Sequence, residues 1–356
     1  MAFDLEKIRA LDALPEEETA WRVRELRQKQ GKDVCLLAHL YQRKRIGELA
    51  DFTGDSYSLS RSAAAFEGGR YIVFAGVRFM AESAAILARP EQQVIHPDPE
   101  AGCPMADMAS LPEVERAWKA LTATGPPMLP ITYMNSTADI KAFCGEHGGT
   151  ICTSSNAHKT FEWAFAQAGR VFFLPDEHLG RNTALKFGID PADIVIWDPE
   201  KPDGGDPEAY ASAKVILWRG YCPVHQKFTV RDIEHVRRFY PKAKVIVHPE
   251  CPADVVAASD LVGSTDFIRK YVAQTAPGDE IFIGTELNLI QNLSAQYPDR
   301  LIAKLHRSLC LTMYQITMGR LLYALENLET IEKVVVPESV RHYSRVALDR
   351  MLKLPG

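Results

Sequence analysis

The feature that most constrains the fold of this 356-residue chain is a pattern of apolar strands with polar ends that occurs three times. In each copy a short run rich in Val, Ile and Leu ends in ring, amide or carboxylate side chains, and a serine-bearing segment follows. A second apolar run comes next, and each copy then reaches a cysteine. The first and third copies have nearly the same spacings, while the second is about twenty residues longer. Such self-similarity predicts three related structural units.

Nine short apolar runs have the composition of strands that are buried on both faces, and longer helical patterns separate them. These runs are 33–39, 71–76, 93–96, 128–135, 149–154, 171–174, 215–218, 244–248 and 280–285. Strands that alternate with helices indicate parallel sheets. The sequence therefore predicts an α/β protein with three similar Rossmann-like parallel-sheet domains around a pseudo-threefold axis, with the active site at the centre.

The repeat also suggests where the units begin and end. We expect a first unit at 1–110, which includes an N-terminal helix, a second at 111–225 and a third at 226–315. The extra length of the second unit is assigned to a surface insertion near 198–210, which is rich in Pro, Gly and Asp. The remaining segment, 316–356, contains an amphipathic helix whose expected role is packing.

Composition and charge exclude several kinds of partner. The net charge of -5 and the pI of about 6.1 give no electrostatic reason to expect nucleic-acid binding. The most apolar run, 71–87, contains Arg78 and Glu82 and is too short to span a bilayer. The N-terminus lacks the basic and apolar regions of a signal peptide. We therefore expect a cytoplasmic protein that binds neither nucleic acid nor membrane.

The polar strand ends predict a binding site. In parallel α/β sheets the ligand crevice lies at the carboxyl ends of the strands. The candidate residues at these ends are His39, Tyr41, Tyr133, Asn135, His248 and Glu250. Hydroxyl residues stand at the expected helix starts, where free N–H groups suit anions; they are Ser56, Ser154, Ser264 and Thr265. If the three units face one another, these groups meet around a ligand with several carboxylate or phosphate groups.

Each unit also contributes one cysteine after its last strand, and these are Cys103, Cys222 and Cys310. Three thiolates that meet at one point can hold zinc, with water in the fourth position, or an iron–sulfur cluster with one open iron. His225, three residues after Cys222, is either a further ligand or a substrate contact. Because the other units have no histidine at that offset, we favour specificity or acid–base chemistry for it.

The other four cysteines fall outside the repeat. Cys35, Cys144 and Cys152 are expected to be small core side chains. Cys251 lies beside strong site candidates, but the equivalent positions of the other units are not cysteine, so we favour Cys222 as the ligand.

Twelve stretches, taken together and in order, resemble the quinolinate synthase family, the A proteins of NAD biosynthesis. They are LAHLYQ (37–42), LADFTGDSYSLS (49–60), GVRFMAE (76–82), GCPMADM (102–108), YMNSTADIKA (133–142), CTSSNA (152–157), FLPDEHLGRN (173–182), WRGYCPVH (218–225), HPEC (248–251), DLVGSTDFI (260–268), GTELNL (284–289) and CLTM (310–313). Leu40 is a departure, because the family often has Asn there.

The resemblance implies three α/β domains around a central [4Fe-4S] cluster held by Cys103, Cys222 and Cys310, with one iron open as a Lewis acid. It implies condensation of iminoaspartate with dihydroxyacetone phosphate to quinolinate, with release of phosphate and water. It also suggests functional coupling to an aspartate-oxidising enzyme.

This chemistry assigns expected roles to the site residues. Glu250 is the candidate base, and the candidate proton carriers or anion partners are His39, His225 and His248. The groups expected to orient intermediates are Tyr41, Tyr133 and Asn135, while the hydroxyl residues at helix starts suit the anionic substrates. Two alternatives use the same scaffold: a cluster-binding sensor without catalysis and a zinc-dependent lyase. A sensor needs only the cysteines, so the presence of Glu250, Tyr41 and His225 favours the enzyme.

Overall fold

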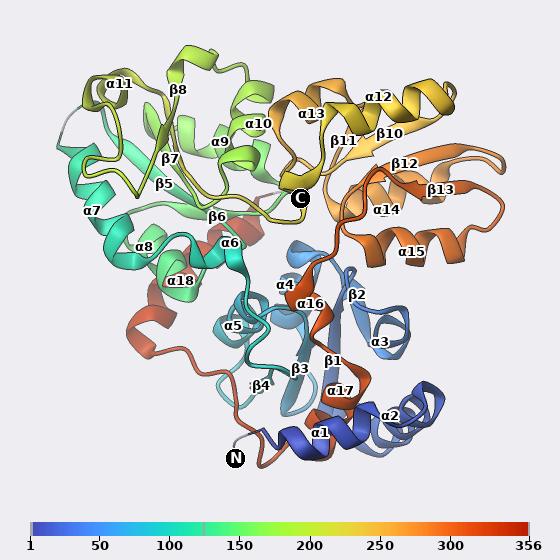
Figure 1. Cartoon of the computed structure of the whole chain (residues 1–356). Helices are drawn as coiled ribbons and strands as arrows, with labels where there is room; N and C mark the ends of the chain where they lie inside the picture. The colour runs from blue at the N-terminus through green and yellow to red at the C-terminus, as the bar shows by residue number, and fades with distance from the viewer. Residues whose placement is uncertain (1–2, 124, 355–356) are drawn as a thin grey trace. The chain divides into compact units, whose positions relative to one another are not determined.

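The computed structural model describes residues 3–123 and 125–354 (Figure 1). Within these residues the strands form three sheets in which every neighbouring pair is parallel. Each sheet is covered by the helices that connect its strands. The predicted α/β class with three similar parallel sheets is therefore confirmed, whereas the threefold arrangement of the units stays a prediction.

The first and third sheets have the same strand order. The first consists, from edge to edge, of β2 (Phe52–Gly54), β1 (Val34–His39), β3 (Tyr71–Ala75) and β4 (Gln93–Ile95). The third consists of β11 (Leu261–Val262), β10 (Lys244–Val247), β12 (Glu280–Gly284) and β13 (Leu301–Lys304). In both, the first strand of the unit lies between the second and the third, which is the pattern that the repeat implies.

The second sheet has the same order with one strand added at its edge. It consists of β6 (Thr150–Cys152), β5 (Met128–Tyr133), β7 (Arg170–Leu174), β9 (Val215–Trp218) and β8 (Ile194–Trp197). β9 takes the place of β4 and β13, so β8 has no counterpart. The extra length of this unit is therefore an edge strand, with the loop 198–206 and helix α11 (Pro207–Ser212) leading on to β9.

All nine strands predicted from apolar runs are present, and four further strands were missed. The missed strands, β2, β8, β11 and β13, all lie at sheet edges. β2 and β11 are three and two residues long, and β13 is exposed at both of its ends. β8 is apolar, but the repeat provides no position for it. Edge strands pack on one side only, so they lack the continuous apolar run that marks a central strand.

The chain divides into two compact units. Residues 1–103 and 309–337 form the first unit, which contains one sheet; residues 104–308 and 338–356 form the second, which contains the other two. The predicted boundaries separate three repeat units and a C-terminal segment, whereas this division separates two compact units. The predicted boundaries therefore stay a prediction.

The helices of the first unit are α1 (Leu5–Asp12), α2 (Glu16–Gln30), η1 (Gly31–Asp33), α3 (Lys44–Leu49), α4 (Ser56–Ala65), α5 (Arg78–Leu87), α16 (Leu311–Tyr314) and α17 (Met318–Glu326). α17 packs against α1 and α2. The Asp12 carboxylate at the end of α1 accepts hydrogen bonds from Thr317 Oγ1 at 3.0 Å and Gly319 N at 2.9 Å. The segment that follows Cys310 is thereby attached to the N-terminal helices.

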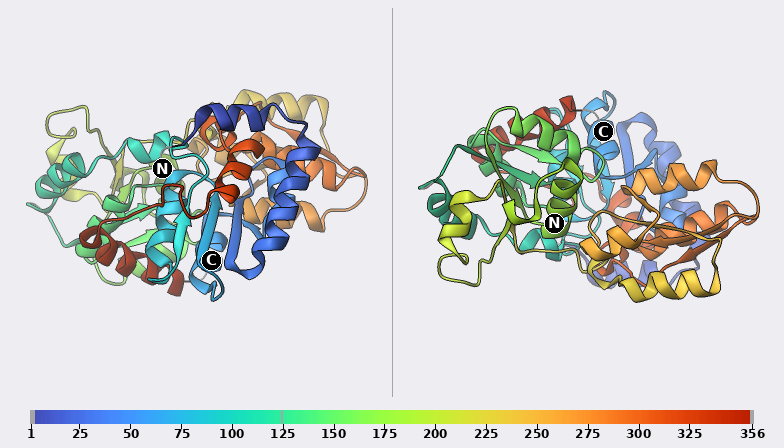
Figure 2. Two further views of the ribbon diagram at one scale, coloured as in Figure 1. Left: turned by 90° about the horizontal axis from the view of Figure 1, so that it is seen from below. Right: turned by 90° about the horizontal axis from the view of Figure 1, so that it is seen from above.

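The helices of the second unit are α6 (Pro104–Asp107), α7 (Leu111–Thr122), α8 (Ala138–Glu146), α9 (Ala157–Phe165), α10 (Glu177–Phe187), η2 (Pro191–Asp193), α11, η3 (His225–Lys227), α12 (Val230–Phe239), α13 (Ala253–Ala258), α14 (Thr265–Gln274), α15 (Leu287–Gln296) and α18 (Glu338–Lys353). The amphipathic C-terminal helix is α18, and it packs against α8 and β6, drawn in dark red beside green in Figure 2. Ser344 Oγ donates to Ala138 O at 2.6 Å. A Cβ atom on Gly145 would lie 2.0 Å from Tyr343 O, so glycine permits this close approach.

None of the helices among residues 3–123 and 125–354 combines the length and the apolarity that crossing a membrane requires.

Candidate active site

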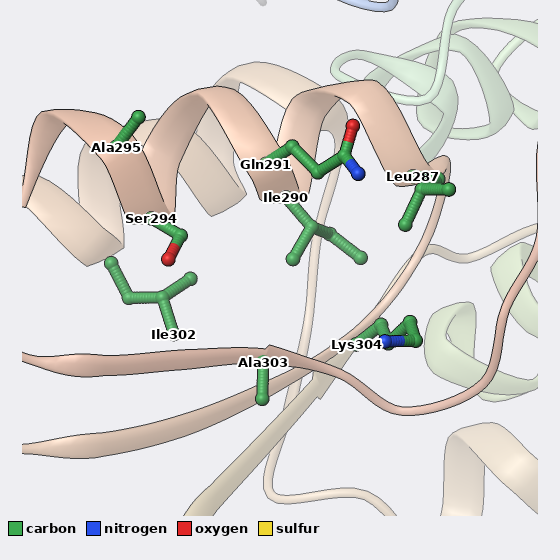
Figure 3. Close-up of a pocket in the computed structure, with 8 residues that line it drawn as sticks. All are labelled: Leu287, Ile290, Gln291, Ser294, Ala295, Ile302, Ala303 and Lys304. Carbon is green, nitrogen blue, oxygen red and sulfur yellow. The ribbon is translucent and has the colours of Figure 1, made fainter.

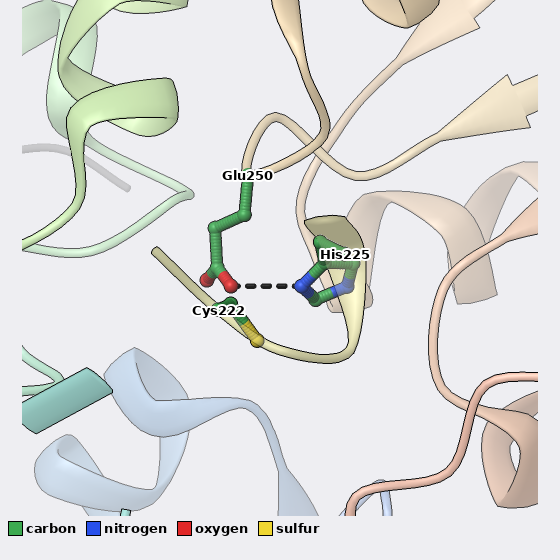
Figure 4. A group of neighbouring side chains, drawn as sticks. All are labelled: Cys222, His225 and Glu250. Carbon is green, nitrogen blue, oxygen red and sulfur yellow. Dashed lines mark hydrogen bonds and ion pairs between the residues drawn. The ribbon is translucent and has the colours of Figure 1, made fainter. Parts of the chain in front are cut away.

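Glu250 is the centre of a buried hydrogen-bond network in the second compact unit. Its side chain is 3% exposed, and its Oε2 lies 2.8 Å from Nδ1 of His225 (Figure 4). Its Oε1 accepts a hydrogen bond of 2.5 Å from the Tyr133 hydroxyl, and His248 Nδ1 lies 3.7 Å from the same oxygen. The carboxylate is thus surrounded by three of the predicted site residues.

Strand ends from both sheets of the second compact unit build this network. Tyr133 is the last residue of β5, and His248 directly follows β10. His225 begins η3, in the segment that follows β9. The second and third units of the repeat therefore contribute to one site, as expected for the carboxyl ends of parallel strands.

Both ring nitrogens of His225 have hydrogen-bond partners, and one face of the ring stacks on another ring. Its Nε2 lies 3.0 Å from Thr285 Oγ1, and its ring stacks on that of His248 with a centroid distance of 4.4 Å and an interplanar angle of 19°. An ionised carboxylate only accepts hydrogen bonds, so Nδ1 of His225 carries the proton that bonds to Glu250. Thr285, fully buried directly after β12, is a site residue that the sequence analysis missed, although its position after a strand within GTELNL was a usable signal.

Burial and charge act in opposite directions on Glu250. Burial by itself raises the pKa of this carboxyl, but the attraction of His225 and His248 and the hydrogen bonds from His225 and Tyr133 hold the pKa well below its usual range. Glu250 is therefore ionised although it is almost completely buried.

A second buried carboxyl close to the network behaves in the opposite way. Asp176 caps α10, where its Oδ1 accepts hydrogen bonds from the N–H groups of His178 and Leu179 at 2.8 and 3.0 Å. Its Oδ2 is buried and has no hydrogen-bond partner among residues 3–123 and 125–354. Burial, and next the negative charge of Glu250, raise the pKa of Asp176 well above its usual range. Two neighbouring carboxyls whose pKa values are driven apart are typical of acid–base sites. Asp176 was also missed, although it follows β7 in the stretch FLPDEHLGRN.

Cys222 adds a sulfur to this group. One ligand atom from each of Cys222, His225 and Glu250 lies within 4.8 Å of the others, so the three side chains could hold a metal ion (Figure 4). Thiolate, imidazole and carboxylate are the ligands that zinc uses in proteins.

The seven cysteines divide into two classes. Three are partly exposed: Cys103, Cys222 and Cys310. Four are buried: Cys35, Cys144, Cys152 and Cys251. Burial raises the pKa of Cys35 to about 12 and raises the pKa of the other three buried thiols well above its usual range. A metal ligand must be a thiolate, so the partly exposed class fits a metal or cluster better than the buried class. This class is the same as the column that the repeat predicts.

The candidate site residues of the first compact unit lie at the ends of its strands and helices. His39 ends β1, and its Nδ1 accepts a hydrogen bond of 3.1 Å from Tyr41 N; the two rings meet edge to face with centroids 4.7 Å apart. Ser56 is the first residue of α4, but the side chain that caps this helix is Asp55, which accepts from Ser58 N at 2.9 Å.

The hydroxyl candidates of the second compact unit differ in their position relative to the helix start. Ser264 caps α14 and accepts a hydrogen bond of 3.3 Å from Phe267 N, and Thr265 is the first residue of that helix. Ser154 lies in the turn before α9, whose N-cap is Asn156. The expected helix starts are thus observed for Ser264 and Thr265, whereas Ser154 precedes its helix.

Asn135 follows β5 by two residues, and its Oδ1 is buried without a hydrogen-bond partner among the residues that the structure describes. An unpaired buried acceptor costs free energy unless a ligand or water satisfies it. This atom therefore suits a donor group of a substrate.

The structure also has a hollow away from these residues, between α15 and β13 (Figure 3). Its lining is Leu287, Ile290, Gln291, Ser294, Ala295, Ile302, Ala303 and Lys304. This lining brings no acid–base pair together and includes none of the predicted site residues.

This chain is similar to known proteins over almost its full length. The family model described as "Quinolinate synthetase A protein" matches residues 22–353. The chain is 49% identical over 350 residues to a quinolinate synthase of a Nocardioides species, which covers 94% of this chain and 89% of the relative. It is 47% identical to that of Acidobacterium capsulatum, covering 97% and 95%, and 45% identical to that of Geobacillus thermodenitrificans, covering 98% and 99%. On the strength of these full-length matches, the chain belongs to the quinolinate synthetase A protein family.

Proposed function

We propose that this chain is a quinolinate synthase that condenses iminoaspartate with dihydroxyacetone phosphate and releases phosphate and water. The observation that carries the proposal, beside family membership, is the ionised and buried Glu250 held between Tyr133 and His225. Formation of a pyridine ring requires repeated proton transfer and stabilisation of developing charge on oxygen. A buried network of a carboxylate, a phenol and two imidazoles is suited to both.

Glu250 is the proposed base. Its low pKa makes it a weak base while Tyr133 and His225 both donate to it. Loss of either hydrogen bond raises the basicity of the carboxylate. We propose that a bound substrate engages Tyr133 or His225, so that this residue no longer donates to Glu250. Glu250 then becomes more basic at the moment when the substrate that gives up the proton is in place.

The other polar candidates are assigned to binding and proton carriage. His39 and His248 carry protons or bind anionic groups, and Tyr41, Tyr133 and Asn135 orient intermediates. The hydroxyl residues Ser56, Ser154, Ser264 and Thr265 bind the carboxylate and phosphate groups of the substrates, which helix N-termini favour.

The proposed cofactor is a [4Fe-4S] cluster with Cys103, Cys222 and Cys310 as ligands. The partial exposure of these thiols, in contrast to the burial of the other four, supports this assignment. When bound, such a cluster supplies an open iron that acts as a Lewis acid toward substrate oxygens.

The proposed cellular setting follows from the substrates. Iminoaspartate hydrolyses readily, so we propose that an aspartate-oxidising enzyme supplies it through functional coupling. We place the reaction in the cytoplasm, where thiol ligands remain reduced.

A zinc-dependent lyase is the second candidate function. The close approach of Cys222, His225 and Glu250 favours it, because these three groups form a complete set of protein ligands for catalytic zinc.

One preparation distinguishes these candidates. The protein is purified without oxygen, its iron, sulfide and zinc contents are measured, and quinolinate formation is assayed on the same sample. We expect about four iron and four sulfide atoms per chain together with quinolinate. Stoichiometric zinc with lyase activity would favour the second candidate, and a full cluster without product would identify a sensor.

A further inference from the structure

The loop that carries Glu250 makes few hydrogen bonds of its own. Pro249 and Pro252 have no N–H group. Within the loop, Cys251 N donates to His248 O at 3.0 Å and Glu250 N donates to His248 Nδ1 at 3.3 Å. These bonds hold one side of the loop, and the carbonyl groups of Pro249 and Cys251, on either side of Glu250, need partners from elsewhere.

A single side chain from α10 holds both carbonyls. Asn182 Nδ2 donates to Pro249 O and to Cys251 O, each at 2.8 Å. Both acceptors are carbonyl oxygens, so the atom that faces them must be the amide nitrogen with its two hydrogens. Asn182 is 8% exposed, so this contact is almost completely buried.

The position of Asn182 is itself determined by the packing of α10. Gly180 lies two residues before it, and a Cβ atom there would lie 2.5 Å from Leu217 Cδ2 and 2.7 Å from Phe173 Cδ1. Glycine therefore lets α10 lie directly on β7 and β9. The cap by Asp176 and the contact between His178 Nε2 and Gln226 Oε1 hold the first turn of the helix.

We propose that Asn182 is the positioning residue for Glu250, acting as a clamp that attaches the Glu250 loop of the third sheet to a helix of the second sheet. The inference rests on the proposed function and assigns a role to the stretch FLPDEHLGRN that the candidate site residues leave unexplained. Asn182 does not touch the reacting groups; it sets the distance from the Glu250 carboxylate to Tyr133 and His225.

The consequence for catalysis is specific. Without the clamp the Glu250 loop shifts, and the hydrogen bonds from Tyr133 and His225 lengthen. Two net hydrogen bonds correspond to about a tenfold to hundredfold effect on rate.

The test compares Asn182→Ala and Asn182→Asp with wild type and with Thr183→Ala. Thr183 is the next residue of α10 and is similarly buried, but its hydroxyl donates to Leu179 O of its own helix at 2.6 Å. Rates are normalised to iron content, and kcat and KM are determined separately. We expect both Asn182 variants to lose about tenfold to hundredfold in kcat with little change in KM, while Thr183→Ala stays close to wild type.

Hydrogen exchange of segment 248–252 provides a readout that does not depend on turnover. Its amides should exchange faster in Asn182→Ala than in Thr183→Ala, even in a protein that makes no quinolinate. A wild type without product overturns the proposed function alone. Unchanged exchange, or an Asn182→Ala enzyme with normal kcat, overturns the clamp.

Discussion

At the scale of single residues, the state of Glu250 depends on a balance between burial and its donors. Transfer of a lone carboxylate into the protein interior costs several kcal/mol, and the group then protonates. Here His225 and Tyr133 donate to its two oxygens, and His248 lies nearby. The charge is retained because each oxygen has a partner, and the same partners are the groups through which protons can leave.

Glu250→Gln should keep the fold and the metal content and lose at least about a hundredfold in kcat, since an amide cannot accept the substrate proton. The measurement is steady-state quinolinate formation, normalised to iron. Glu234→Gln on the exposed surface of α12 is the control for the charge change. Near-normal turnover by Glu250→Gln would remove this residue from the mechanism.

Asp176 gives a prediction on stability and pH. Its pKa is raised by folding, so above about pH 4 it is protonated in the native protein and ionised in the unfolded chain. The unfolded state then binds fewer protons, and stability falls as pH rises from there to the raised pKa. Asp176→Asn removes this dependence and keeps an oxygen for the cap.

The free energy of unfolding of Asp176→Asn should therefore increase relative to wild type as the pH rises from 5, by up to about 1.4 kcal/mol per pH unit. Denaturant titrations from pH 5 to 8 measure this difference. Asp206→Asn is the control, since Asp206 caps α11 in the same way but is exposed. A difference that stays constant with pH would show that Asp176 is ionised in the native protein.

At the scale of secondary structure, the strand-to-helix connections of the second and third sheets repeat one device. A carboxylate two residues after the strand caps the next helix: Asp176 caps α10 and Glu286 caps α15, each accepting from two backbone N–H groups. In the first sheet the equivalent residue is Val77, and α5 has no side-chain cap. The second and third units of the repeat thus share this cap, and the first unit lacks it.

Substitution of Ser56 and of Ser264 should distinguish the loss of anion binding from the loss of a helix cap. Ser56→Ala and Ser264→Ala should each weaken quinolinate binding about tenfold or more, because the hydroxyl is lost from an anion site. Only Ser264→Ala should also lower stability, by about 1 kcal/mol, because Ser264 caps its helix and Ser56 does not.

Calorimetric titration with quinolinate and thermal unfolding measure the two effects. Thr229→Ala is the matched control, since Thr229 caps α12 through a capping box; it should lower stability and leave affinity unchanged. Full affinity in Ser56→Ala would exclude this serine from the binding site.

At the scale of the whole molecule, the proposed cluster depends on cysteines that are far apart in the chain. Cys103 and Cys310 belong to the first compact unit, and Cys222 belongs to the second. Their separations in sequence exceed any local metal-binding loop, so the proposed ligands do not belong to one short motif.

Cys103→Ser, Cys222→Ser and Cys310→Ser should each lose the cluster and activity together, since a hydroxyl oxygen is a poor substitute for thiolate at iron. Cys251→Ser is the informative control: Cys251 is next to Glu250 in sequence but fully buried, and its Sγ lies 3.7 Å from Gly284 O. It should keep the absorbance and the iron content of wild type under anaerobic conditions. Loss of iron from Cys251→Ser together with retention in Cys222→Ser would reverse the assignment.

The sequence by itself determined the central architecture of this protein. Buried parallel strands such as β1, β5 and β12 require continuous apolar runs, so they are visible in the sequence, and the threefold repeat of their polar ends located Tyr133, His248 and Glu250. Short edge strands such as β2 and β11 have too few buried residues to produce a pattern. The repeat also places Cys222, and not Cys251, in one column with Cys103 and Cys310, and the burial of Cys251 sets it apart from these three in the same way.

Only the tertiary structure decided how the site is held together. Asn182 binds two backbone carbonyls about seventy residues away, and a carbonyl has no signature in the sequence. Thr285 matters because it meets His225 on another segment, and Asp176 because the fold removes its free oxygen from water and sets it beside a charge. Such contacts join side chains across the packing of two sheets, so their geometry exists only once helix α10 and the loop after β10 are in place.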